Sequence, residues 1–153
     1  MNKGNTKMAK IYFDVCCYNR PFDDLTQEKI RLETEALLLI INRILNNEYT
    51  LYESPAIQFE LSKMTDNYKK KKVVVLYSSI KKDMLEYNKN INIRVKALDA
   101  FNIKYFDALH IAFCEFHYID YMITTDKVLL NSVKRSDIKV RVMNPIDFVM
   151  EVL

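Results

Sequence analysis

The sequence predicts an α/β protein, a three-layer α/β/α sandwich with a central, mainly parallel sheet. Short, β-prone apolar runs alternate along the chain with segments of helical periodicity, an order typical of parallel strands joined by crossover helices. The 153 residues contain no internal repeat and no proline-rich linker. We therefore expect one domain over residues 10–153, preceded by a flexible N-terminus over residues 1–9.

Local patterns place the elements in order. The apolar run Ile11-Tyr12-Phe13 predicts a buried first strand. Asp24 and Gln27 have capping-box spacing, and apolar periodicity then predicts a helix over 25–46. Ser54-Pro55 predicts the start of another helix after a strand over 50–53. The remaining expectations are helices over 67–86, 91–101, 105–117 and 127–134, strands over 121–125 and 138–143, a C-cap at Asn102, and a terminal helix from Asn144-Pro145.

Composition excludes several classes of function. A single glycine, Gly4, rules out a glycine-rich phosphate loop. Two histidines and three cysteines cannot supply a closed four-ligand zinc site of familiar spacing. The odd number of cysteines and the lack of a long apolar run favour a cytoplasmic protein without a membrane segment.

The charge of the chain is unevenly distributed. Residues 63–104 contain 11 basic and 4 acidic residues, although the whole chain has a net charge of only +3. Such a segment is either a solvated, lysine-rich face or a surface for a polyanion. The candidate phosphate-binding residues within it are Lys69, Lys70, Lys71 and Lys72.

Four acidic residues occupy positions that suggest a common site. Asp14 and Asp126 directly follow predicted strands, Glu60 lies within the apolar stripe of its helix, and Asp107 begins a helix that is apolar almost all round. Taken singly, Asp107 and Asp126 could be helix caps, and Glu60 could reach solvent. If the four carboxylates converge, their repulsion requires a cation, and carboxylate oxygens suit Mg²⁺ or Mn²⁺.

The segments around these acids resemble the motifs of the PIN-domain family. The similar strings are IYFD (11–14), SPAIQFEL (54–61), FDALHIA (106–112) and ITTD (123–126), and NPIDF (144–148) resembles the end of a bacterial subgroup. The resemblance covers the chain from about residue 9 onward. It implies a PIN-like fold.

The resemblance also implies an activity, a metal-dependent ribonuclease that is often the toxin of a VapC-type toxin–antitoxin pair. The implied catalytic and metal-binding residues are Asp14, Glu60, Asp107 and Asp126, with Mg²⁺ or Mn²⁺ as cofactor and RNA as substrate. An antitoxin protein and a homodimer are the implied partners. Thr124 matches a family threonine that could orient a ligand or water.

Other polar residues near these motifs have weaker predicted roles. Many family members carry Asn, Ser or Thr shortly after the first Asp, whereas this chain has Val15-Cys16-Cys17, and we expect both cysteines to pack. Asn19 and Arg20 lie in a polar loop that substrate could pass. His110 could be an additional ligand, although a buried histidine hydrogen-bonded to a neighbour is the more common arrangement.

Two alternative functions remain open. One is a PIN-fold RNA- or protein-binding module without turnover. The other is a phosphoaspartyl hydrolase with Asp14 as nucleophile, but that chemistry normally needs a second Asp two residues later, where this chain has Cys16.

Overall fold

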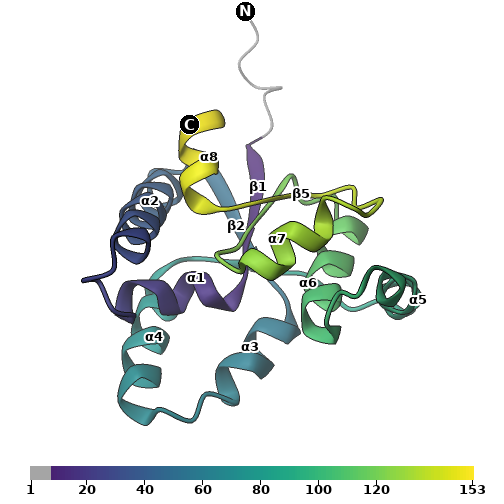
Figure 1. Cartoon of the computed structure of the whole chain (residues 1–153), viewed down its shortest axis with the longest axis horizontal. Helices are drawn as coiled ribbons and strands as arrows, with labels where there is room; N and C mark the ends of the chain where they lie inside the picture. Colours follow the sequence, from purple (N-terminus) through teal and green to yellow (C-terminus); the bar gives the residue numbers. More distant parts are fainter. Residues whose placement is uncertain (1–7) are drawn as a thin grey trace, which may run out of the picture.

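The computed structural model describes residues 8–153 and contains a central sheet of five parallel strands in the order β3-β2-β1-β4-β5 (Figure 1). The strands are β1 (Ala9–Phe13), β2 (Tyr49–Glu53), β3 (Asp83–Met84), β4 (Tyr121–Ile123) and β5 (Arg141–Met143). The predicted α/β class, with its parallel sheet between helical layers, is confirmed.

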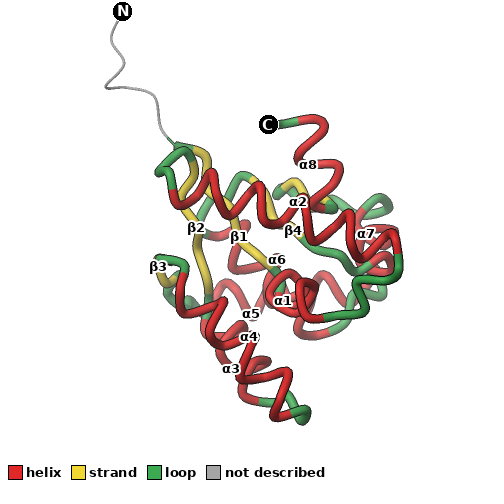
Figure 2. Tube along the Cα trace, turned by 90° about the vertical axis from the view of Figure 1, so that its left-hand side faces the viewer, coloured by secondary structure: helices red, strands yellow, loops and turns green. Residues whose placement is uncertain are grey.

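Helices connect the strands and cover the sheet. In Figure 1, α2 and α8 lie on one side of the strands, and α5 and α6 lie on the other. Figures 1 and 2 both place α3 and α4 at the end of the molecule opposite the chain termini. The helices are α1 (Val15–Asn19), α2 (Glu28–Leu45), α3 (Pro55–Ser62), α4 (Asn67–Ser79), α5 (Lys89–Leu98), α6 (Tyr105–Phe116), α7 (Lys127–Val133) and α8 (Pro145–Glu151), with short 3-10 turns η2 (Arg20–Phe22) and η3 (Asp99–Phe101).

Strand β1 is the centre of the core. Its residues Ile11, Tyr12 and Phe13 are at most 1% exposed, and β2 and β4 pair with it on either side. Because successive side chains of a strand point to opposite faces, Tyr12 faces α6 whereas Ile11 and Phe13 face the other layer. The carboxyl end of β1 points toward α1 and α3 (Figure 1).

Several predicted helix ends are confirmed. The Ser54 hydroxyl caps α3 by accepting from Ala56 N–H, and Pro55 is its first residue. Asn144 caps α8 in the same way by accepting from Ile146 N–H. Asn102 is left-handed, with φ of 59°, at the end of η3.

Other predicted boundaries are wrong. The helix expected over 67–86 ends at Ser79, and Asp83–Met84 forms edge strand β3 instead. The Lys82 ammonium binds the carbonyl oxygens of Tyr77 and Ile80, so a residue outside the helix satisfies groups at its end. Helix α1 follows the first strand at positions for which no helix was expected, and the last strand begins at 141 rather than 138.

The expected N-terminal segment is only partly testable. Residues 1–7 lie outside the described residues, and Ala9, the last residue expected to be flexible, begins β1. Within residues 8–153, no helix combines the length and apolar character needed to cross a membrane.

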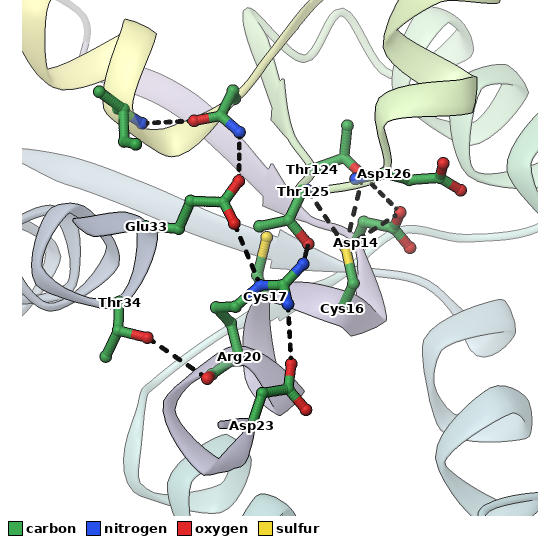
Figure 3. Close-up of polar contacts among 12 residues, drawn as sticks. Asp14, Cys16, Cys17, Arg20, Asp23, Glu33, Thr34, Thr124, Thr125 and Asp126 are labelled. Atoms are coloured by element: carbon green, nitrogen blue, oxygen red, sulfur yellow. Dashed lines mark hydrogen bonds and ion pairs between the residues drawn. The ribbon is translucent and has the colours of Figure 1, made fainter. Parts of the chain in front are cut away.

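A buried ion network joins the start of the chain to its end. Glu33, fully buried on α2, lies 3.3 Å from Arg20 Nε and accepts a hydrogen bond from the Asn144 side-chain amide (Figure 3). Arg20 also donates to Asp23 at 3.0 Å and to the Thr125 hydroxyl at 2.8 Å. The network therefore ties η2, α2, the end of β4 and the start of α8 together.

We expect Glu33→Ala to lower the free energy of unfolding by about 3 kcal/mol, because Arg20 loses the more deeply buried of its two carboxylate partners and the Asn144 amide loses its acceptor. Chemical denaturation measures the change. The control is Glu35→Ala on the exposed side of α2, where a surface pair with Arg31 is lost and the expected change is at most about 1 kcal/mol. Equal losses in both variants would contradict the structural role of the network.

Candidate functional site

Asp14 lies at the carboxyl end of β1 and is the N-cap of α1. Its side chain is buried and both of its carboxylate oxygens accept hydrogen bonds. Oδ1 accepts from Val15 N–H at 2.8 Å, and Oδ2 accepts from the Thr124 hydroxyl at 2.8 Å (Figure 3). The local turn and the neighbouring strand together hold this carboxylate in one orientation.

Thr124 connects the first and last of the predicted acids. It is fully buried, and while its hydroxyl donates to Asp14 it accepts from Asp126 N–H at 3.1 Å. Asp126 Oδ1 in turn caps α7 by accepting from Val128 and Leu129 N–H, which leaves Oδ2 without a capping role. Asp126 is therefore a helix cap, as the simpler interpretation expected. Its backbone N–H is also connected to the Asp14 carboxylate by the Thr124 hydroxyl.

A second chain of hydrogen bonds holds Glu60. The Glu60 carboxylate accepts from His110 Nε2, and His110 Nδ1 lies 2.6 Å from the Tyr12 hydroxyl, which lies 2.7 Å from the Ser54 hydroxyl. In the neutral imidazole, Nδ1 accepts from Tyr12, and in the charged form it donates to Tyr12. Both forms keep Nε2–H directed at Glu60.

Asp14, Glu60 and His110 form a compact cluster. Each offers one possible ligand atom within 4.8 Å of the other two, and His110 Nε2 is 3.8 Å from Asp14 Oδ1. Burial lowers the pKa of His110, but the hydrogen bond to Glu60 and the charge of Asp14 outweigh it, so the pKa is raised overall. The cluster can hold a divalent metal ion.

Asp107 completes the acidic group from the first turn of α6. The pKa of Asp107 is raised to about 7, first by burial and then by the negative charges of Asp14 and Asp126, with a smaller contribution from Glu60. Asp107 is also not the N-cap of α6, because that position is Lys104, so the interpretation of Asp107 as a cap is wrong. Asp107 is therefore close enough to Asp14, Asp126 and Glu60 for their charges to act on it.

The remaining neighbours differ from expectation. Cys16 does not simply pack: its thiol lies 3.5 Å from Asp14 Oδ2 and 3.4 Å from Thr124 Oγ1, and it accepts from Thr125 N–H. Cys17 is buried, as expected. Arg20 is held by the Glu33 network beside the site rather than projecting from a loop, and the buried Asn19 Oδ1 has no hydrogen-bond partner within residues 8–153.

The four lysines on α4 are in different environments. Lys69 forms an ion pair with Asp23, Lys70 donates to the Ser62 carbonyl oxygen, and Lys72 lies over the Tyr68 ring. Lys71 is exposed. Lys69 is thus already neutralised within the protein, and RNA binding by Lys70, Lys71 and Lys72 stays a prediction.

Sequence reasoning missed the groups that orient Glu60. It placed His110 correctly among buried, hydrogen-bonded histidines, but it did not connect this residue to Glu60 or to Tyr12 and Ser54. Tyr12 reads as an ordinary member of an apolar strand, and Ser54 as an ordinary N-cap. No local signal distinguishes them, since their shared role depends on the packing of β1 against α3 and α6.

Tyr12→Phe tests this chain of hydrogen bonds. Because it removes the partner of the buried His110 Nδ1, we expect a loss of about 1–3 kcal/mol in the free energy of unfolding. Metal affinity, measured by calorimetric titration with Mn²⁺, should fall by about tenfold as Glu60 loses its support. The control is Tyr52→Phe on β2, whose hydroxyl makes no hydrogen bond among the described residues. Equal effects of the two substitutions would argue against the chain.

Comparison with known proteins identifies the fold. No protein-family model and no curated protein matches the sequence. The structure is similar to FitAcB from Neisseria gonorrhoeae, with 14% identity and a TM-score of 0.51 over 88% of this chain and 97% of that chain. It is similar also to VapBC2 from Rickettsia felis bound to a DNA fragment from their promoter, with 13% identity and a TM-score of 0.54 over 88% of this chain and 98% of that chain. The chain has the PIN-like fold that its motifs predict.

Proposed function

We propose that this protein is a divalent-metal-dependent endoribonuclease, which hydrolyses RNA phosphodiester bonds. The observation that supports the proposal is the cluster of Asp14, Glu60 and His110 at the carboxyl end of β1 in a PIN-like sheet. Burial and then the charges of Asp14 and Asp126 raise the pKa of Asp107, and a cation at this position would relieve both effects.

The donor set fits Mg²⁺ or Mn²⁺. Hard divalent cations prefer carboxylate oxygens, and the proposed site has four carboxylates: Asp14 directly after β1, Glu60 on α3, Asp107 on α6 and Asp126 directly before α7. These four acids would hold the ion or ions. His110 would become a further ligand only if the metal replaced the Nε2 proton that faces Glu60. When bound, the metal activates water and neutralises charge on a phosphoryl group.

The protein itself supplies orientation. Thr124 sets the rotation of the Asp14 carboxylate, and Asp126 is fixed by its own capping hydrogen bonds. His110 aims Glu60 inward although α3 is a surface helix whose Phe59 is 47% exposed. Preorganised ligands of this kind reduce the cost of positioning water and substrate at the moment of reaction.

The phosphoaspartyl alternative is less well supported. The Cys16 thiol occupies the neighbouring position where that chemistry normally needs a second acid. A phosphoryl group would also meet the charges of Glu60 and Asp107 unless a metal intervened.

The binding-module alternative conflicts with the same charges. Several carboxylates at one edge repel an RNA phosphate in the absence of a cation. A protein that only bound RNA would gain affinity by losing these acids. In such a protein, no function would offset the free-energy cost of burying the Asp14 carboxylate.

Removal of metal separates these possibilities. We expect excess chelator to abolish RNA cleavage and Mg²⁺ or Mn²⁺ to restore it. Asp14→Asn should lower the cleavage rate by about 100-fold or more, since changes around a metal's ligands alone cost about 10–100-fold. The variant should stay folded, because it relieves repulsion in the metal-free site. Asp147→Asn, an equal charge change at an exposed position of α8, is the control. Undiminished cleavage in chelator would exclude the metal mechanism.

We further propose that the protein acts as the toxin of a toxin–antitoxin pair. Two observations support this role: the VapC-type motifs, and the similarity in fold to VapBC2. A nuclease that needs only a common cation and water would harm its own cell unless a partner inhibited it. An inhibitor with a basic side chain could neutralise the acidic site in place of the metal.

Expression in a bacterial host tests the toxin role. Induction of the protein alone should halt growth, whereas Asp14→Asn should be harmless at equal abundance. Co-expression of a small protein encoded beside it should restore growth and copurify with the chain. Normal growth with catalytically active protein would instead favour a housekeeping nuclease.

A further inference from the structure

An open aromatic groove lies beside the acidic site. It has a volume of about 580 Å³ and is bounded by α3, the start of α6 and the segment leading into α5. Its principal lining residues are Pro55, Phe59, Tyr87, Asn92, Tyr105 and Phe106. The groove contains none of the four acids, so it is separate from the metal ligands.

The aromatic rings of the groove are unusually exposed. Phe59 is 47% exposed, Tyr87 55% and Tyr105 59%. Phe59 stacks on Phe106 with ring centroids 5.3 Å apart and planes 14° apart, and Tyr105 packs edge-on against Phe106. The protein thus presents a rigid aromatic platform to solvent, and clustered exposed apolar surface of this kind indicates a binding site.

The aromatic platform lies on the same two helices as Glu60 and Asp107. Phe59 directly precedes Glu60 on α3, and Phe106 directly precedes Asp107 on α6. Residues adjacent in a helix point in directions about 100° apart. A ligand that contacts these rings therefore lies near Glu60 and Asp107, each of which is the next residue along its helix.

Polar groups and a positive charge surround the rings. The Asn92 side-chain amide donates to the Tyr87 hydroxyl, and both residues line the groove. The Lys63 ammonium lies 5.0 Å from the Phe59 ring centroid. Aromatic faces with a nearby cation and hydrogen-bonding side chains are the combination by which proteins bind single-stranded nucleic acid.

Charge favours RNA over a second copy of the chain. Two lining residues, Tyr87 and Asn92, belong to the segment 63–104, which carries 11 basic and 4 acidic residues. The two ends of that segment adjoin the groove, because Lys63 lies over Phe59 and Lys104 directly precedes Tyr105. A two-fold contact across this face would bring like-charged segments of two copies together, and such juxtaposition is unfavourable. A polyanion has the complementary charge.

We propose that the groove binds an unpaired base of the RNA strand, with a nucleobase stacked on Phe59 or Tyr105 while the adjoining backbone reaches the carboxylates. This inference rests on the proposed ribonuclease function and adds a base-binding site outside the four carboxylates. The stacked base is a sequence-tolerant anchor, because every base presents a π face.

Binding without turnover tests the groove. The Asp14→Asn protein is titrated against a 2-aminopurine-labelled single-stranded oligoadenylate and against an RNA duplex of equal length. We expect Phe59→Ala and Tyr105→Ala, each in that background, to weaken single-strand binding by about 5- to 100-fold, the range typical of one lost base–aromatic stack. Duplex binding and the salt dependence of affinity should not change, because no phosphate contact is removed. Quenching of 2-aminopurine should diminish in parallel.

Two controls accompany these variants. Phe59→Tyr keeps an aromatic face and should bind as the parent does, and Tyr118→Ala removes an 84% exposed ring outside the groove and should have no effect. Thermal melting verifies that every variant is folded.

Three results would overturn the proposal: unchanged single-strand affinity in both alanine variants, equal losses for single strand and duplex, or a shift from dimer to monomer in sedimentation that accounts for the lost binding. The last would assign the groove to a second copy. Failure of the ribonuclease proposal gives a different result. A protein that binds single strands through Phe59 but never cleaves RNA would support the groove as a binding site and contradict the ribonuclease proposal.

Discussion

The burial of Asp14 at the end of the central strand is the constraint on which the rest of the site depends. A buried carboxylate is costly unless hydrogen bonds or opposite charges compensate it. Asp14 is 6% exposed and is compensated by Val15 N–H, by the Thr124 hydroxyl and by His110 at 3.8 Å. These groups come from α1, the end of β4 and α6. Correct pairing of β1 with β4 is therefore needed before the carboxylate can be accommodated.

Hydrogen bonds of the same kind also hold the other acids of the site in place. Two buried hydrogen-bonded connections, through Thr124 to Asp126 and through His110 to Glu60, hold acids that repel one another. The pKa of Asp107 is raised to about 7, first by burial and then by the charges of Asp14 and Asp126. A cation or a basic side chain beside these acids would relieve the unfavourable charge, so the proposed metal binding and the proposed inhibition would have the same electrostatic cause.

Local signals were sufficient for most of the fold. Ser54-Pro55 and Asn144-Pro145 begin helices because a side-chain oxygen accepts an otherwise unpaired N–H and proline fits the first turn. The prediction failed over 67–86, where helical periodicity continues past Ser79 but the backbone turns away to pair β3 with β2. Sheet pairing is a long-range interaction, and a local window of sequence carries no information about it.

By itself, the sequence predicted the α/β class and the mainly parallel sheet and singled out the four acids, because alternating periodicities and strand-end acids are local properties. The order of the strands within the sheet came from the tertiary structure. Only the tertiary structure decided which groups support those acids. It assigned Arg20 to Glu33, directed the Cys16 thiol at Asp14, and joined Ser54, Tyr12 and His110 into a chain ending at Glu60. Apart from Cys16 and Asp14, these partners are separated by many residues in the sequence. Their contacts exist only once the helices pack against the sheet and exclude water from the polar groups between them.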